Sequence, residues 1–194
     1  TIGVSPLRVV AVVGGVTALF AGTIALCNND LKGVFAYSTV SQLGYMFLGL
    51  GALSATSGVF HLVTHAFFKA LLFLTAGSVM HALAGTLDIR KMGGMGKHMP
   101  VTKWLMFAGC LALAGFPFTA GFFSKDEILA FAWEDNVALW AVGFLTAILT
   151  AFYMSRQVFM TFFGDYRYND PDLEEVDAAW TAYLADAAES AEAK

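Results

Sequence analysis

The segment Val59-Phe-His-Leu-Val-Thr-His-Ala-Phe-Phe-Lys-Ala-Leu-Leu-Phe73 places two histidines and one lysine inside a continuous apolar run. The run extends from Gly58 to Met80, and a helix of roughly 20 mostly apolar residues spans the hydrocarbon core of a bilayer. His61, His65 and Lys69 recur at every fourth position, so each step turns the helix by only about 40° and climbs about 6 Å. The sequence therefore predicts a transmembrane helix that carries these three side chains on one face, with Lys69 at the middle of the membrane.

The composition of the whole chain is that of a membrane protein. Of its 194 residues, 58% are hydrophobic and only 13% are charged, whereas a soluble domain carries about 25% charged residues. The net charge of −4 excludes a basic nucleic-acid-binding protein. Cys27 and Cys110 are too few for a disulfide framework, an iron–sulfur cluster or a four-ligand zinc site. These features exclude a soluble globular enzyme.

Five stretches of the sequence are long and apolar enough to cross a bilayer as helices. They are Leu7–Cys27, Gly33–Leu53, Gly58–Met80, Val101–Trp133 and Val137–Phe163. The runs are far longer than the roughly 10 residues of a barrel strand, and they show no alternation. The predicted fold is an all-α, polytopic transmembrane helix bundle over residues 1–164, followed by a soluble acidic tail over residues 165–194.

The fourth stretch is predicted to be a broken helix, because Gly115-Phe-Pro-Phe-Thr-Ala-Gly121 interrupts it. Ser124-Lys-Asp-Glu127 matches a capping box that would restart the helix. Lys125 would then lie at the positive end of a new half-helix inside the membrane, as charged residues do at the ion sites of transporters. The alternative is a helix that ends at Phe116 and an external loop that carries Ser124 to Glu127, which the apolar residues around that segment disfavour.

Charged side chains at membrane depth mark ion pathways by default. His titrates near neutrality, and a lysine removed from water gives up its proton more readily, so His61, His65 and Lys69 suit proton transfer. Alternatives remain for each: histidines that only bond neighbouring helices, a metal site that would lack a third ligand, or a structural lysine. Since about 6 Å is too far for a direct hydrogen bond, water or partner hydroxyls would have to bridge these groups.

A second polar face accompanies this one in the Gly33–Leu53 span. It consists of Ser38, Ser41, Gln42 and Tyr45 at helical spacing. These side chains either hold water or make ordinary hydrogen bonds between helices.

Positively charged residues concentrate in the segments that the five spans place on one side of the membrane. They are Lys32, Arg90, Lys91, Lys97, Lys103 and Arg167. This side is expected to be cytoplasmic, or to face the matrix, and Arg8 is the exception. Arg156, near the same end of the last span, is expected to extend to the lipid headgroups as a structural residue.

The tail from Asp165 onward is acidic, with nine Asp and Glu against Arg167 and Lys194. Asp170 is expected to cap a short helix that has Pro171 at its first position. Apolar residues between Leu173 and Ala187 follow at amphipathic spacing. The acidity argues against docking on anionic lipid, so a protein partner or simple solvation is expected.

Several of these segments resemble the antiporter-like membrane subunits of respiratory complex I, above all the most distal of the pump subunits. The resemblance rests on Thr64-His-Ala-Phe-Phe-Lys-Ala-Leu-Leu-Phe73 and Thr119-Ala-Gly-Phe-Phe-Ser-Lys-Asp-Glu127, together with the segments Asn29 to Tyr45 and Asp88 to Gly94. It implies a proton-translocating subunit without a redox centre of its own. FMN, iron–sulfur clusters and quinone would be held by other subunits.

The resemblance also assigns roles to individual residues. The positions of His61, His65 and Lys69 belong to a hydrated central axis in that family. Lys125 matches a key protonation site, and the neighbouring Asp126 is also implicated. The expected partners are the other membrane subunits of complex I and the lipid bilayer, with protons as the transported ion.

The matched segments correspond to the second of two inverted repeats in that family, so the chain is expected to be a fragment or the product of a split gene. The alternative function is a subunit of a multisubunit sodium/proton antiporter, which shares the helix pattern and both lysines. A membrane scaffold without transport is a third possibility that the buried lysines disfavour. The expected location is a bacterial inner membrane, or the mitochondrial inner membrane, with several passes.

Overall fold

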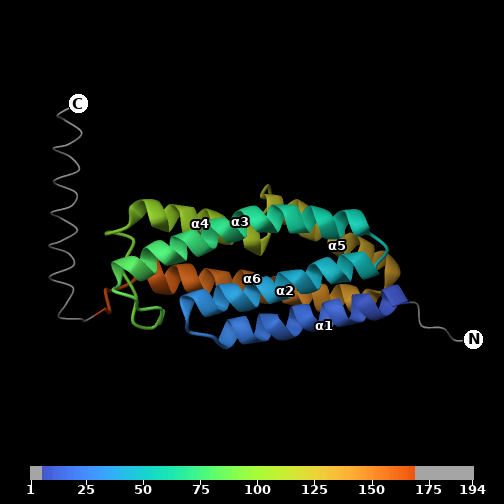
Figure 1. The fold of residues 1–194 in the computed structure, drawn as a ribbon, viewed down its shortest axis with the longest axis horizontal. Helices are drawn as coiled ribbons and strands as arrows, with labels where there is room; N and C mark the ends of the chain where they lie inside the picture. Colours follow the sequence, from blue (N-terminus) through green and yellow to red (C-terminus); the bar gives the residue numbers. More distant parts are fainter. Residues whose placement is uncertain (1–5, 169–194) are drawn as a thin grey trace, which may run out of the picture.

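The computed structural model describes residues 6–168 of the chain. Over that range it contains six α-helices and no β-strand: α1 Pro6–Cys27, α2 Leu31–Gly51, α3 Ala55–Ala82, α4 Pro100–Ala114, α5 Ala120–Asp135 and α6 Val137–Phe162. The helices lie along the long axis of one bundle (Figure 1). The all-α prediction is therefore confirmed. The helix predicted between Leu173 and Ala187 lies outside the described residues.

The break between α4 and α5 lies midway along the bundle, and the other connections lie at its two ends (Figure 1). The turn from α1 to α2 lies beside the segment between α3 and α4, because the Ile89 amide donates to the Asn29 carbonyl at 2.9 Å. The C-terminal end of α6 contacts the same segment between α3 and α4, since the Gly96 amide donates to the Phe162 carbonyl at 3.1 Å. This end carries Lys32, Arg90, Lys91, Lys97, Lys103 and Arg167, and we call it the cation-rich end.

By length and hydropathy, α1, α3 and α6 are the three described helices that can each cross a membrane. The sequence therefore predicted five spans, whereas these criteria identify three among the described residues. The helix α2 differs because it carries Ser38, Ser41 and Gln42 in its interior, and all three are buried inside the bundle. The two halves of the broken helix, α4 and α5, are each shorter than a span.

The helices α1 and α2 pack closely through small residues, among them Gly14 and Ala18 of α1 and Gly44 of α2. A Cβ atom on Gly44 of α2 would lie 2.5 Å from the backbone nitrogen of Ala18. A Cβ atom on Gly14 would lie 2.6 Å from the backbone nitrogen of Leu48. Glycine is required at these positions because the two backbones leave no space for a side chain.

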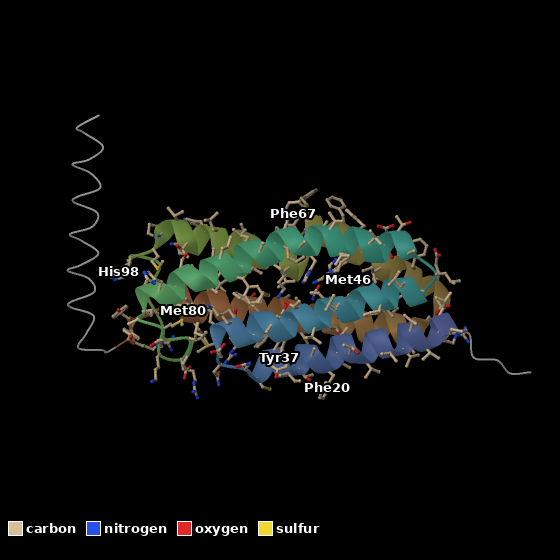
Figure 2. All side chains as sticks on the ribbon, in the orientation of Figure 1. Phe20, Tyr37, Met46, Phe67, Met80 and His98 are labelled. Carbon is tan, nitrogen blue, oxygen red and sulfur yellow. The ribbon has the colours of Figure 1, made fainter. Side chains whose placement is uncertain are left out.

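The outer surface of the bundle is apolar. Phe67 on α3 is 77% exposed and Phe20 on α1 is 67% exposed, and both project away from the bundle (Figure 2). Surfaces of this kind are stable against lipid but not against water. Many polar side chains of the helices are instead buried inside the bundle.

The helix break is confirmed, but its restart differs from the prediction. Helix α4 ends at Ala114, and Gly115 follows in the left-handed conformation with φ of 80°, which glycine adopts without steric cost. Helix α5 begins at Ala120, where the Thr119 side chain accepts a hydrogen bond from the Phe122 amide. The predicted capping box at Ser124 is therefore wrong, and so is the alternative of an external loop. Ser124 lies inside α5 and is buried.

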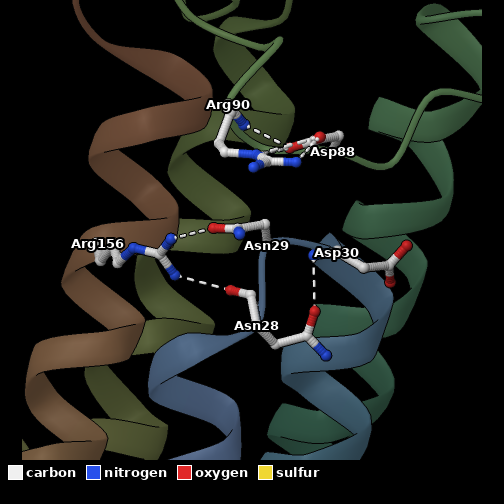
Figure 3. Close-up of polar contacts among 6 residues, drawn as sticks. All are labelled: Asn28, Asn29, Asp30, Asp88, Arg90 and Arg156. Carbon is white, nitrogen blue, oxygen red and sulfur yellow. Dashed lines mark hydrogen bonds and ion pairs between the residues drawn. The ribbon is translucent and has the colours of Figure 1, made fainter.

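Arg156 also has partners other than those expected. Its guanidinium donates to the backbone carbonyls of Leu26, at 3.2 Å, and Asn28, at 2.8 Å, and to the Asn29 side chain. Figure 3 shows this arrangement beside the Asp88–Arg90 ion pair. The expectation that Arg156 extends to lipid headgroups is wrong, because the unsatisfied carbonyls at the end of α1 bind it. Arg156 still has a structural role, as expected, because it joins the end of α1 to α6.

Candidate functional site

Helix α3 carries the three predicted site residues on one buried face. His61 is fully buried, His65 is 6% exposed and Lys69 is 5% exposed. The ring centroids of the two histidines lie 6.1 Å apart, as expected for one climb of about 6 Å per four residues. The predicted spacing is confirmed, and Lys69 lies at the middle of α3.

The Lys69 ammonium is held by a backbone carbonyl and two aromatic rings. Nζ donates to the Phe35 carbonyl of α2 at 2.8 Å. The same nitrogen lies 5.7 Å from the centroid of the Phe35 ring and 5.9 Å from that of Phe73, so cation–π attraction supplements the hydrogen bond. The described residues contain one ion pair with a nitrogen–oxygen distance within 4 Å. It joins Asp88 and Arg90 at the cation-rich end. No carboxylate within residues 6–168 therefore forms an ion pair with Lys69.

His61 joins three helices through hydrogen bonds. Its Nδ1 atom lies 2.8 Å from the Ser124 hydroxyl of α5, and its Nε2 atom lies 3.0 Å from Oε1 of Gln42 on α2. With a carbonyl oxygen as the partner of Nε2, that nitrogen carries the proton and Nδ1 can accept from Ser124. The Thr64 hydroxyl donates to the Ser124 hydroxyl at 3.0 Å. His61 thus bonds one hydroxyl directly, and a second hydroxyl bonds the first.

Lys125 lies in the second turn of α5, and its side chain bonds the end of the preceding helix. Its ammonium donates to the carbonyl of Leu113, in the last turn of α4, and lies 5.5 Å from the Tyr45 ring centroid. The C-terminal end of a helix carries partial negative charge, which attracts a cation. Lys125 thus lies near the positive end of a half-helix, as predicted, but its long side chain reaches back across the break to the negative end of α4. Lys125 is buried, with 4% exposed.

The two other predicted site residues, His65 and Asp126, differ in their burial. His65 is buried, and its Nε2 atom has no hydrogen-bond partner among residues 6–168. Asp126 is exposed on the surface of α5, so the structure does not bring it to the buried groups. In the described part of the chain, no three His, Cys, Asp or Glu side chains are grouped as a metal ion requires.

The second polar face serves two purposes. Ser41 donates to the Ala18 carbonyl of α1 at 2.8 Å, and the Tyr45 hydroxyl donates to the Gly143 carbonyl of α6. These two side chains join helices, as the structural alternative proposed. Gln42 instead faces His61, and its Nε2 atom has no hydrogen-bond partner within the described range.

The sequence pattern of the NADH:quinone oxidoreductase/Mrp antiporter transmembrane family matches residues 5–150. The chain belongs to this family. A NAD(P)H-quinone oxidoreductase subunit 5 of the organellar chromatophore of Paulinella chromatophora is 50% identical over 175 residues, which are 86% of this chain and 26% of the relative. NADH-quinone oxidoreductase subunit L of Rickettsia bellii is 50% identical over 161 residues, which are 83% of this chain and 25% of the relative.

A solved Mrp complex from Dietzia sp. has the same fold as this family member. Its matching chain superposes with a TM-score of 0.77 at 29% identity, over 83% of this chain and 31% of that chain. The chain described here thus spans about a quarter of the length of the curated relatives it matches. It is an integral membrane protein, and its bacterial relatives support an inner-membrane location.

The sequence reasoning missed three polar residues in this family member. Ser124 was predicted to be a helix cap, yet it bonds His61. Tyr153 and Gln157 on α6 were not singled out, although both are fully buried. The regular spacing of polar residues along the last span could have indicated the two residues of α6. These polar residues are Thr146, Thr150, Tyr153, Gln157 and Thr161.

Proposed function

We propose that this chain forms part of a proton-translocating membrane subunit of an NADH-quinone oxidoreductase, and that protons move along the buried groups of Lys69, His65, His61 and Lys125. FMN, iron–sulfur clusters and quinone belong to other subunits, and the partners of this chain are the other membrane subunits. The observation that carries the proposal is the burial of two lysine amines without a carboxylate partner among the described residues.

A buried lysine costs several kcal/mol in a membrane, so it is retained only where its charge has a use. Each amine here is bonded to a single backbone carbonyl, Phe35 for Lys69 and Leu113 for Lys125. A carbonyl accepts a hydrogen bond from an ammonium or from a neutral amine, so either protonation state keeps a partner. This arrangement suits a group that gains and loses a proton.

The histidines supply the steps between the amines. His65 lies within electrostatic range of both lysines, and His61 lies within range of Lys125. The two rings are too far apart for a direct hydrogen bond. Water bonded to Nε2 of His65, which has no partner among residues 6–168, completes the path. Charges on neighbouring groups repel, so a proton that arrives at one amine favours the release of a proton from the next.

Lys125→Ala in the full-length subunit, assembled in its complex, tests the proposal. We expect proton translocation to fall by roughly tenfold or more, the usual loss for a missing proton-transfer group, while the peripheral arm still oxidises NADH with an artificial acceptor. Lys125→Arg should be nearly as inactive, because arginine does not release its proton usefully. Lys97→Ala is the matched control, since it removes the same charge from the exposed surface at the cation-rich end. Unchanged translocation in an assembled Lys125→Ala complex would overturn the proposal.

The second candidate is a subunit of a sodium/proton antiporter, which the 29% identical Mrp chain supports. The identity to the oxidoreductase subunits is higher, at 50%. Sodium transport driven by a proton gradient in vesicles, without any dependence on NADH, would favour the antiporter.

A further inference from the structure

Helix α6 carries a polar face that the proposed proton path does not use. Five residues on this face are fully buried: Thr146, Thr150, Tyr153, Gln157 and Thr161. Their spacing of three or four residues places them on one side of the helix. The face runs from Thr146 to Thr161, about 22 Å of helix, and ends at the cation-rich end of the bundle.

Most of these side chains have partners that explain their burial. Thr146 donates to the Val142 carbonyl at 2.7 Å, and Thr150 donates to the Thr146 carbonyl at 2.9 Å, so both are satisfied within their own helix. The Tyr153 hydroxyl donates to the Ser38 hydroxyl of α2 at 3.0 Å.

Gln157 is different. Its side chain is fully buried, and neither Nε2 nor Oε1 has a hydrogen-bond partner within residues 6–168. Buried amides in native proteins are nearly always bonded, and an unbonded one costs about 1–3 kcal/mol. Leucine would fill the same volume without that cost, so the amide itself requires an explanation.

The position of Gln157 provides one, because it lies between the buried site and the cation-rich end. Tyr153, one turn toward the site, bonds Ser38, and Gln42 one turn further along α2 bonds His61. The Lys69 ammonium bonds the Phe35 carbonyl, one turn from Ser38 in the other direction.

Thr161, one turn beyond Gln157, marks the other end of this face. Its hydroxyl lies 3.8 Å from the sulfur of Met92, and its carbonyl accepts from the Met95 amide at 3.4 Å. Both methionines belong to the segment between α3 and α4, at the cation-rich end. Gln157 therefore occupies the interval of about two helical turns between Tyr153 and Thr161, roughly 12 Å.

We propose that Gln157, with Tyr153, binds a short chain of water molecules that conducts protons between the His61–Lys69 site and the cation-rich end of the bundle. This inference rests on the proposed function. The amide oxygen accepts a hydrogen bond from one water and the amide nitrogen donates to another, and Tyr153 can donate and accept. The first water forms an O–H bond with the incoming proton and breaks another of its O–H bonds as it passes that proton to the next water, so one proton leaves the far end for each one that enters. The amide stays neutral and does not trap the proton, as a carboxylate would.

Gln157→Leu separates this role from simple packing. If the amide has only a structural role, its replacement by leucine leaves the assembled complex equally or more heat-stable, with normal proton translocation. If it binds conducting water, heat stability is kept but translocation falls, by roughly tenfold for a water bridge that loses both of its partners. Gln157→Asn keeps the amide and should restore a large part of the rate. Thr146→Val is the matched control, because it removes a buried hydroxyl of the same face that is satisfied within its own helix.

The experiment measures translocation in the full-length subunit within its complex, with Lys125→Ala in parallel. A normal rate in Gln157→Leu together with a loss in Lys125→Ala overturns the water chain and leaves the proposed function standing. Normal rates in both overturn the proposed function. A high-resolution density map of the unaltered complex decides the case if Gln157→Leu does not assemble. Ordered water within hydrogen-bond distance of both amide atoms supports the inference, and an amide bonded only to protein groups overturns it.

Discussion

The Nδ1 atom of His61 on α3 lies 2.8 Å from the hydroxyl of Ser124 on α5. The residue after Ser124 is Lys125, so this hydrogen bond places the broken helix and the histidine face in one connected unit. Thr64 reinforces the contact by donating to the same hydroxyl. His61 and Thr64 of α3 are thereby held against Ser124 and Lys125 of α5.

Ser124→Ala should impair proton translocation without preventing assembly. The substitution removes the hydroxyl that His61 and Thr64 share, and a lost buried hydrogen bond of this kind costs about 1–3 kcal/mol. The rate of translocation and the thermal midpoint of the assembled complex are the measurements. Ser155→Ala is the control, because the Ser155 hydroxyl bonds only the Ala151 carbonyl on the exposed face of α6. Equal behaviour of the two variants would show that the bond to His61 has no functional weight.

Gly44→Ala should disrupt the packing of α1 against α2. Its methyl group would lie 2.5 Å from the Ala18 backbone nitrogen, and overpacking against a backbone costs about 1–3 kcal/mol or more. We expect a lower yield of folded protein in the membrane and a lower thermal midpoint. Gly77→Ala provides the contrast, since nothing lies within 4 Å of a Cβ atom there, and alanine favours the helix by up to about 1 kcal/mol. A stable Gly44→Ala variant would refute the close contact.

Arg156→Ala should destabilise the cation-rich end more than Arg90→Ala does. Arg156 satisfies two backbone carbonyls and the Asn29 side chain from a half-buried position, and charged hydrogen bonds of this kind are each worth about 1.5–3 kcal/mol. Arg90 pairs with Asp88 on the exposed surface, where ion pairs contribute little. Thermal unfolding of the purified variants gives the comparison. Arg156→Lys should also be destabilised, because an ammonium cannot reach the three acceptors that the guanidinium fork binds.

Asp88 should titrate at unusually low pH. The hydrogen bond from the Arg90 guanidinium lowers the pKa of Asp88 to about 2. A lowered pKa means that the ion pair is fully formed above the unfolded value of about 4 and is lost as the pH falls toward 2. Carbon-13 NMR of the Asp88 carboxyl group in lipid nanodiscs measures the midpoint directly. In Arg90→Ala the midpoint should rise toward about 3.9, and an unchanged midpoint would show that Arg90 is not the cause.

Much of the fold was predictable from local sequence. The helix bounds agree with the predicted spans to within a few residues, and Gly115 ends α4 inside the break that was expected. The errors concern helix starts and partners. Ser124 matched a capping pattern, yet Thr119 caps α5, because several short sequences can satisfy the same free backbone amides. Arg156 was assigned to lipid because the sequence does not show that the end of α1 lies beside it.

The sequence by itself determined the membrane environment, the helices and the common face of His61, His65 and Lys69. These properties follow from composition and from the 3.6-residue period of a single helix, which do not depend on neighbouring elements. Only the tertiary structure decided that Lys125 bonds the Leu113 carbonyl of α4, that Ser124 bonds His61, and that Gln157 is buried without a partner among the described residues. Each of these depends on how segments far apart in the chain pack together, and that packing is set by contacts between several helices at once.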